Sequence, residues 1–181
     1  MGEIVSQLMD IIRERRSVRL YKNKTLSADI INSLLEVAKF APTARNLQQL
    51  EYKIITNKDL IKKISDRITA IVKKEYPSMQ LRDRSNLFYD APLLIVVTGP
   101  KENIWAYSDA ALAVQNIMLY ATSLHLGTCF IGMARFIERD EELLRELHIT
   151  NDRKVAAAVI CGYPDEKPAE KEKKMNVEFF N

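Results

Sequence analysis

The sequence predicts an α+β domain in which helices wrap a mixed sheet and one long helix lies buried at its centre. Apolar residues recur at helical spacing in several segments, and short apolar runs of strand length lie between them. The chain opens with two helical segments, so it lacks the regular strand–helix alternation of a parallel α/β fold. The longest helical segment has few charges and is apolar on almost all sides, which is typical of a buried helix.

The first two helices are predicted before residue 43. A helix over residues 3–14 follows from apolar residues at helical spacing, namely Ile4, Leu8, Ile11 and Ile12. Residues 17–21 are then expected to be extended. A second helix within residues 25–42 has Ser27 as its cap and ends before Pro42, because the residue before a proline avoids helical angles.

A strand over residues 50–56 and a helix over residues 57–77 come next, with Asn57 as the helix cap. The expected buried stripe of that helix is Leu60, Ile64, Ile68, Ile71 and Val72. Residues 79–90 fit no single pattern. The apolar run of residues 91–99 predicts a central strand.

The longest helix is predicted within residues 103–127, with Gly127 as the left-handed residue that ends it. Residues 128–133 indicate a short strand or turn, residues 138–149 a helix, and residues 154–164 a final strand. The tail, residues 164–181, is a charged extension that ends in "VEFFN". Because it cannot bury itself in its own chain, we expect its apolar end to dock on another surface.

Composition indicates one domain, residues 1–181, with 47% hydrophobic residues for a core. A net charge of +3 is too small to indicate nucleic-acid binding. Cys129 and Cys161 form no CxxC pair, so we expect no metal site and a reducing, cytoplasmic compartment. No segment is long and apolar enough to span a membrane, and the N-terminus does not resemble a secretory signal.

Residues 13–21, "RERRSVRLY", are the first candidate site. In an extended chain, side chains alternate, so Arg15, Ser17 and Arg19 point to one side and Arg16 and Val18 to the other. Guanidinium groups with a hydroxyl between them suit a phosphate monoester. A solvated basic turn at the end of a helix explains this stretch equally well.

Residues 41–52, "APTARNLQQLEY", are the second candidate site. The amides of Asn46, Gln48 and Gln49 offer donors and acceptors that suit the edge of a heteroaromatic ring. A turn with Asx-type bonds is the alternative. The chain has five glycines and no GxGxxG or GxxxxGK[ST], which excludes the glycine-rich nucleotide folds. Neither histidine supports a Ser-His-Asp or Cys-His arrangement.

Three further stretches accompany these two, namely "DAPLLIVV", "LHLGTCFIGM" and "CGYP" followed by a lysine-bearing tail. On all of these stretches together, the chain resembles the FMN-dependent nitroreductase family. Order and spacing agree over essentially the whole chain. The resemblance implies a largely antiparallel sheet and a homodimer that binds one FMN at each of two subunit interfaces. It also implies NADH or NADPH as electron donor and a small-molecule acceptor.

The resemblance also implies the cofactor-binding residues. The flavin phosphate, ribityl chain and pyrimidine edge would contact Arg15, Arg16, Ser17 and Arg19. The other subunit would contribute Pro42, Thr43 and Asn46, with Gln48 nearby. The isoalloxazine would lie against the backbone of Phe130, Ile131 and Gly132. The phosphate would also contact tail residues Lys171 and Lys173, so that the tail docks on the neighbouring subunit.

Three features depart from the family pattern. Gln49 and Leu50 stand where the family often has a proline and an aromatic residue. Arg84 and Leu87, with Asn86 between them, stand where an asparagine and a lysine are frequent. The chain is also short, with little room for the helices that line a substrate channel, so the sequence names no particular substrate.

The resemblance implies ping-pong reduction of nitroaromatics, quinones or similar electron-poor acceptors. The flavin would carry this chemistry, so no catalytic side chain is assigned. Tyr52, Tyr89, Tyr107 and Cys129 fit either a pocket or the core. Three alternatives stay open: a flavin-storage or redox-sensing module, a flavin-free site for another phosphorylated ligand, and a different reaction of the same family.

Overall fold

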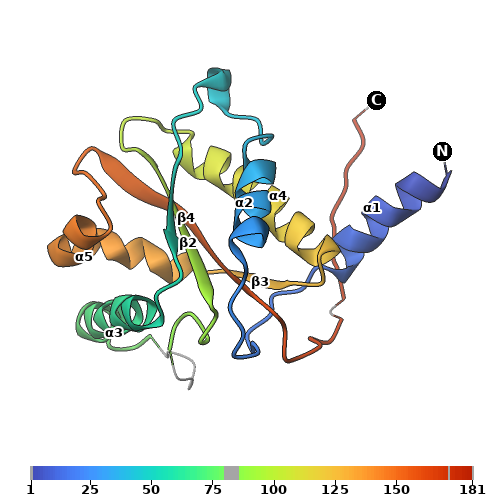
Figure 1. Ribbon diagram of the computed structural model, residues 1–181. Coiled ribbons are helices and arrows are strands. Elements are labelled where there is room, and N and C mark those ends of the chain that lie inside the picture. The colour runs from blue at the N-terminus through green and yellow to red at the C-terminus, as the bar shows by residue number, and fades with distance from the viewer. Residues whose placement is uncertain (1, 80–85, 171, 181) are drawn as a thin grey trace.

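The computed structural model describes residues 2–79, 86–170 and 172–180, with side chains from Gln7 onward. Helices lie on both sides of one sheet (Figure 1), in the element order that the sequence predicts. The elements are α1 (Gly2–Glu14), α2 (Ala28–Ala38), the 3₁₀ turn η1 (Ala44–Asn46), β1 (Glu51–Ile55), α3 (Lys58–Glu75), β2 (Leu93–Pro100), α4 (Ala106–Ser123), β3 (Gly127–Phe130), the 3₁₀ segment η2 (Gly132–Arg139), α5 (Glu141–Glu146) and β4 (Arg153–Gly162).

The sheet has four strands in the order β1-β2-β4-β3, and all three strand pairs are antiparallel. β2 is a central strand, as predicted, and its residues from Leu93 to Thr98 are all buried. An isolated parallel bridge joins Ser17 to Thr128 at the β3 edge. The predicted α+β class and the mostly antiparallel sheet are confirmed.

Two cores cover the two faces of the sheet. Leu93, Ile95 and Val97 of β2 face a core with α2 and α4, whereas Leu94 and Val96 face a core with α3 and η2. This division follows from the alternation of side chains along a strand. A long run of apolar residues in β2 therefore serves both faces at once.

The predicted helix caps are confirmed. Ser27 Oγ accepts a hydrogen bond from Ile30 N at 3.3 Å, and Asn57 Oδ1 accepts one from Leu60 N at 3.0 Å. Ile64, Ile68 and Val72 of the predicted α3 stripe are buried, whereas Leu60 and Ile71 are only half-buried. Ile61 and Ser65 are buried in addition.

α4 ends differently from the prediction for Gly127. His125 is the left-handed residue, with φ 56°, and its N–H donates to Thr122 O at 2.9 Å. Leu126 N donates to Ala121 O at 2.8 Å, which completes a Schellman motif. Gly127 instead belongs to β3, so the prediction for this glycine is wrong. Histidine tolerates the left-handed region better than most residues do.

The tail begins as an extended segment beside residues 20–22. Lys22 N donates to Tyr163 O and Asp165 N donates to Leu20 O, both at 2.9 Å. Further along, four apolar side chains are exposed, namely Met175, Val177, Phe179 and Phe180. Among the described residues, no helix has both the length and the hydropathy to cross a membrane.

Candidate functional site

The arginine segment, residues 15–19, lies along the outer edge of β3. Val18 N donates to Thr128 O at 2.9 Å, next to the bridge between Ser17 and Thr128. A Cβ built on Gly127 would lie 2.8 Å from three side-chain carbons of Val18, so the close approach requires glycine there. Main-chain pairing and a glycine contact therefore position the segment.

Val18 is buried in the core, whereas Arg15, Arg16, Ser17 and Arg19 are half-buried. Burial does not separate Arg16 from Arg15 and Ser17, so the alternation of these side chains stays a prediction. The Arg19 guanidinium lies 6.0 Å from the ring centre of Tyr89, and its Nη1 donates to Ser17 O at 3.3 Å.

Tyr21 anchors the end of the segment. Its hydroxyl donates to Val18 O at 2.7 Å. Burial raises the pKa of Tyr21 above its ordinary value, so the phenol stays protonated and keeps this bond.

Arg16 contacts the end of α1 and the tail. Its Nη1 donates to Arg13 O and Arg15 O, at the C-terminal end of α1, and its Nη2 lies 3.4 Å from a carboxylate oxygen of Glu170. Arg16 also lines a cavity of about 480 Å³ together with Val18 and the start of the tail. Glu166 accepts a hydrogen bond from Arg19 N. The tail thus brings carboxylates to the arginine segment.

The stretch Phe130–Gly132 lies at the same edge of the sheet. Phe130 lies two residues beyond Thr128 along β3, the strand that the arginine segment joins at the isolated bridge between Ser17 and Thr128. Phe130 is 44% exposed, and a Cβ on Gly132 would meet nothing within 4 Å. A pocket of about 130 Å³ lies here, lined by Tyr107, Phe130, Ile131, Gly132, Arg135 and residues 155–158 of β4.

The amide loop, residues 43–49, lies at the end of the molecule away from the arginine segment (Figure 1). Thr43 Oγ1 accepts a bond from Gln48 N at 3.1 Å, and Gln48 Nε2 donates to Asn46 Oδ1 at 2.9 Å. Arg45, Asn46 and Gln48 all have φ between 52° and 55°. Non-glycine residues in this region cost about 1–3 kcal/mol each and persist only where the surroundings hold them. Pro42, Asn46 and Gln48 are exposed.

Two charged side chains hold the amide loop from outside, and the sequence interpretation missed both. Asp109 of α4 is 5% exposed, and its Oδ1 accepts a hydrogen bond from Ala44 N at 2.9 Å. Arg153 of β4 donates from Nη2 to Gln49 O at 2.7 Å. A lone acidic residue within an otherwise apolar helix is the signal that could have identified Asp109.

Within one chain, the arginine segment and the amide loop lie far apart. The amide loop leads into β1 at one edge of the sheet, whereas the arginine segment pairs with β3 at the other edge. Three strand spacings separate these edges, roughly 14 Å. The two segments also lie near opposite ends of α4, whose 18 residues span roughly 27 Å.

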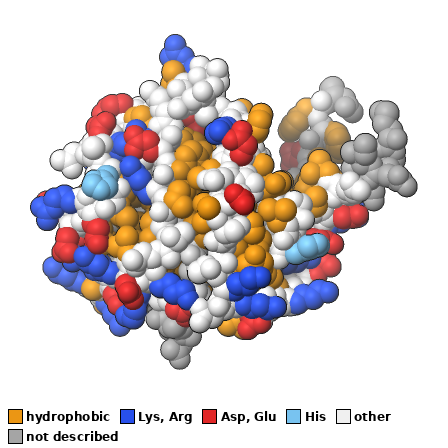
Figure 2. Space-filling view, viewed as in Figure 1, with side chains coloured by type: hydrophobic (Ala, Val, Ile, Leu, Met, Phe, Trp, Pro, Cys, Tyr) orange, Lys and Arg blue, Asp and Glu red, His pale blue; other side chains and the backbone are white. Residues whose placement is uncertain are grey.

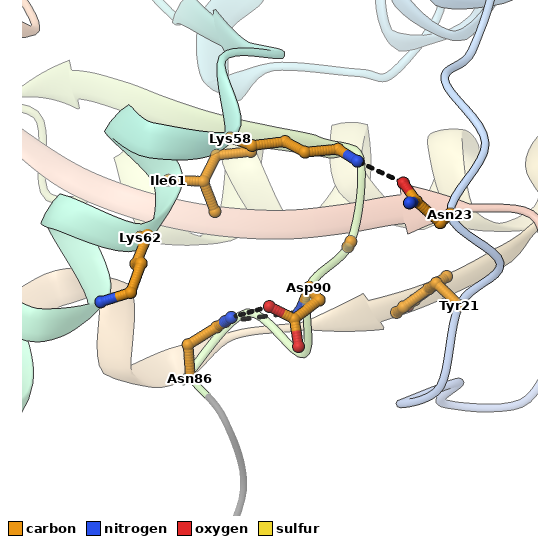
Figure 3. A pocket seen from close by; sticks show the side chains of 8 residues that line it. Tyr21, Asn23, Lys58, Ile61, Lys62, Asn86 and Asp90 are labelled. Atoms are coloured by element: carbon orange, nitrogen blue, oxygen red, sulfur yellow. Dashed lines mark hydrogen bonds between the residues drawn. The ribbon is translucent and has the colours of Figure 1, made fainter.

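The stretch before β2 lies on the side of α3. Asn86 and Asp90 are hydrogen-bonded to each other and line a pocket of about 330 Å³ with Tyr21, Asn23 and Lys58 (Figure 3). Leu87 N donates to Ser65 Oγ at 2.9 Å. Arg84 and Lys171 lie outside the described residues, and Lys173 is exposed on the extended tail.

The donors at the β3 edge fit FMN. Arg15, Ser17 and Arg19 provide the guanidinium and hydroxyl groups that bind a phosphate monoester. The open space at Gly132 beside the exposed ring of Phe130 leaves room for a planar ring system. Within the part of the chain that the structure describes, no three histidine, cysteine or acidic side chains are grouped to hold a metal ion.

Comparison with known proteins identifies the family. The sequence pattern of the nitroreductase family matches residues 12–163. A Bacillus subtilis protein, YfhC, which carries a provisional NAD(P)H nitroreductase name, is 30% identical over 176 residues, covering 93% of this chain and 90% of that protein.

Two solved structures agree with this match. The FMN-bound nitroreductase of Bacteroides fragilis has a TM-score of 0.84 at 27% identity, covering 97% of both chains. The FMN-bound nitroreductase of Desulfitobacterium hafniense has a TM-score of 0.80 at 25% identity, covering 95% of this chain and 98% of that one. With its matched pattern and the same fold, the chain belongs to the nitroreductase family.

Proposed function

We propose that this protein is a homodimeric, FMN-dependent NAD(P)H oxidoreductase that reduces nitroaromatics, quinones or similar electron-poor acceptors. The main-chain pairing of residues 17–18 with Thr128 carries this proposal, because it sets cationic donors on the strand that leads into the open stretch Phe130–Gly132. The FMN found in the solved relatives supports the choice of cofactor.

Each predicted residue then has a binding role. Arg15, Ser17 and Arg19 hold the phosphate and the neighbouring polar atoms of FMN, and their charge favours negative charge on the cofactor. Arg16 holds the tail through Glu170 and so supports the same end of the site. Lys171 and Lys173 follow Glu170 and would contact the phosphate at this end of the site, while the apolar end of the tail docks on the neighbouring subunit.

When bound, FMN supplies two-electron redox chemistry between NADH or NADPH and the acceptor. The chain's part is to bind and orient. The backbone of residues 130–132, which lines the small pocket at the end of β3, would support one face of the ring. Donor and acceptor would use the other face in turn, which produces ping-pong kinetics.

The exposed apolar surface supports a dimer. Leu112 and Tyr107 of α4 are 46% and 42% exposed, and α1 exposes Leu8, Met9 and Ile12. On the face seen in Figure 2, hydrophobic side chains gather at the centre and extend toward α1. Exposed apolar side chains gathered on neighbouring elements are typical of an interaction site.

A two-fold axis across α4 explains how the site is completed. Two antiparallel copies of α4 would bring the N-terminal end of one helix to the C-terminal end of the other. The amide loop lies at the first end and the arginine segment at the second. Pro42, Thr43, Asn46 and Gln48 of one subunit would then reach the cofactor held by the other.

The visible absorbance of the purified full chain tests the cofactor, before and after addition of FMN. We expect a flavin spectrum and one FMN per chain. A protein that stays colourless with added FMN overturns the proposal and favours another phosphorylated ligand.

Steady-state oxidation of NADH and NADPH with menadione or nitrofurazone tests the activity. We expect parallel double-reciprocal lines, the pattern of a ping-pong reaction. Bound FMN without turnover overturns the enzymatic proposal and indicates a flavin-storage or redox-sensing module.

A further inference from the structure

We infer that Asp109 is a positioning residue, which with Arg153 shapes the amide loop so that it can bind the cofactor of the partner subunit. This inference rests on the proposed function. Neither residue belongs to the segments that the sequence marks as cofactor-binding. Both are charged side chains that reach the loop from other elements, α4 and β4.

Asp109 lies where packing alone does not require a carboxylate. It is buried in the first turn of α4, between alanines of an apolar helix face. Burying a carboxylate is unfavourable unless it is hydrogen-bonded, and Ala44 N supplies a bond of 2.9 Å. The positive end of the helix dipole also favours an acidic group in this turn. Asp109 thus fits its place as the acceptor for the loop.

The hydrogen bond from Ala44 N to Asp109 lies next to the residues of the loop that have positive φ. Ala44 directly precedes Arg45 and Asn46, which both have φ of 55°. A conformation of this kind needs support from its surroundings. The bond from Ala44 N to Asp109 gives that support on the N-terminal side of Asn46.

Arg153 supports the C-terminal side of the loop. Its Nη2 donates to Gln49 O at 2.7 Å and to Thr98 O at 3.0 Å, and its Nε donates to Thr98 Oγ1 at 3.0 Å. Its Nη1 also lies 3.2 Å from Glu51 Oε1. The planar guanidinium therefore joins the loop end to β1 and β2.

The first experiment compares Asp109→Ala with Asp109→Asn by fluorescence titration of FMN. Asparagine keeps an oxygen that accepts the N–H of Ala44, whereas alanine does not. We expect Asp109→Ala to weaken FMN binding about 10-fold, the effect of losing one buried hydrogen bond. Asp109→Asn should stay within about 3-fold of the wild type.

Asn116→Ala is the matched control. Asn116 also lies on α4, and its Nδ2 donates to Val37 O at 3.3 Å, which ties α4 to α2 rather than to the loop. We expect it to lower the melting temperature without changing FMN affinity. If Asp109→Ala binds FMN as the wild type does, or if Asp109→Asn fails to rescue, the inference is wrong.

Arg153 keeps the inference testable if Asp109→Ala does not fold. Arg153→Lys retains the charge but lacks the planar guanidinium group. It should weaken FMN binding, while the melting temperature of the FMN-free protein changes little. Equal FMN affinity in Arg153→Lys would contradict the role of this residue.

A mixed dimer tests the action on the partner subunit. Asp109→Ala chains are combined with Arg15→Ala/Ser17→Ala chains. If the loop acts across the interface, each mixed dimer has one intact site and binds one FMN with wild-type affinity. If the loop acts within its own chain, no intact site forms, and the inference fails. A wild-type protein that binds no FMN would instead refute the proposed function.

Discussion

The arginine segment and the amide loop are both candidate cofactor-binding segments, but they are held in different ways. Main-chain bonds to β3 and the buried side chain of Val18 hold the arginine segment. Side chains of Asp109 and Arg153 hold the amide loop, which has three residues of positive φ. Ligand-binding side chains can therefore be replaced in the first segment without reshaping it, whereas distant substitutions can reshape the second.

The two arrangements suit different tasks. Phosphate binding needs several donors at fixed spacing, and an extended segment paired with a strand provides that spacing. The loop instead projects away from its own sheet (Figure 1). A projecting loop has few packing contacts of its own, so its shape depends on side-chain bonds at its two ends.

The largest effect is expected from Arg15→Ala combined with Ser17→Ala. Hydrogen bonds to charged groups are worth about 1.5–3 kcal/mol each, so FMN affinity should fall about 100-fold or more. Because main-chain bonds hold the segment, the melting temperature of the FMN-free protein should change by about 2 °C or less. Titrations with FMN and riboflavin, together with thermal melts, measure both effects.

Arg13→Ala is the control for that pair, because Arg13 is exposed in the last turn of α1. It should leave FMN affinity unchanged. The double variant should lose much less affinity for riboflavin than for FMN, since riboflavin lacks the phosphate. An unchanged preference for FMN over riboflavin would contradict the phosphate assignment.

A smaller effect is expected from deleting residues 169–181. This deletion removes the exposed Phe179 and Phe180 but keeps the bonds of the chain near Asp165 and Glu166. We expect a weaker dimer and about 10-fold weaker FMN binding, since a cation and its phosphate bond are lost. Sedimentation at several protein concentrations measures the dimer.

Two point variants separate the parts of the tail. Phe179→Ser/Phe180→Ser should weaken the dimer, whereas Lys173→Ala should weaken FMN binding. A truncated protein that remains a stable, fully loaded dimer would show that the tail does not dock.

Gly127→Ala tests the contact under the arginine segment. The new methyl would meet Val18 at 2.8 Å, so either the segment or β3 must move. Overpacking of this kind costs about 1–3 kcal/mol, and we expect the melting temperature and FMN affinity to fall together. Gly132→Ala is the matched control for stability, because a Cβ there meets nothing within 4 Å. Unchanged melting of Gly127→Ala would mean that the segment is not held by close approach.

The smallest effect is expected for the two cysteine thiols, one in β3 and one in β4. Cys129 and Cys161 are buried, and burial raises the pKa of Cys161 to about 12. At pH 8 neither should react with a disulfide reagent until urea unfolds the protein. The unfolded thiol ionises near 9.0, below the folded value, so this group lowers stability as the pH rises above 9. Rapid reaction of Cys129 would show that β3 opens.

Local patterns predicted much of the fold. Ser27 and Asn57 were identified as caps because a cap acts within three residues of itself. Gly127 was misjudged because its role is a contact with Val18, which is distant in sequence.

The sequence by itself determined the order of the elements and the chemistry of the two candidate segments. Periodicity, capping and side-chain type act over a few residues and need no knowledge of distant contacts. Only the tertiary structure decided that the arginine segment lies beside Thr128 at one edge of the sheet and that Asp109 and Arg153 hold the amide loop at the other. Strand order and helix length set those positions, and both depend on contacts between residues far apart in the chain.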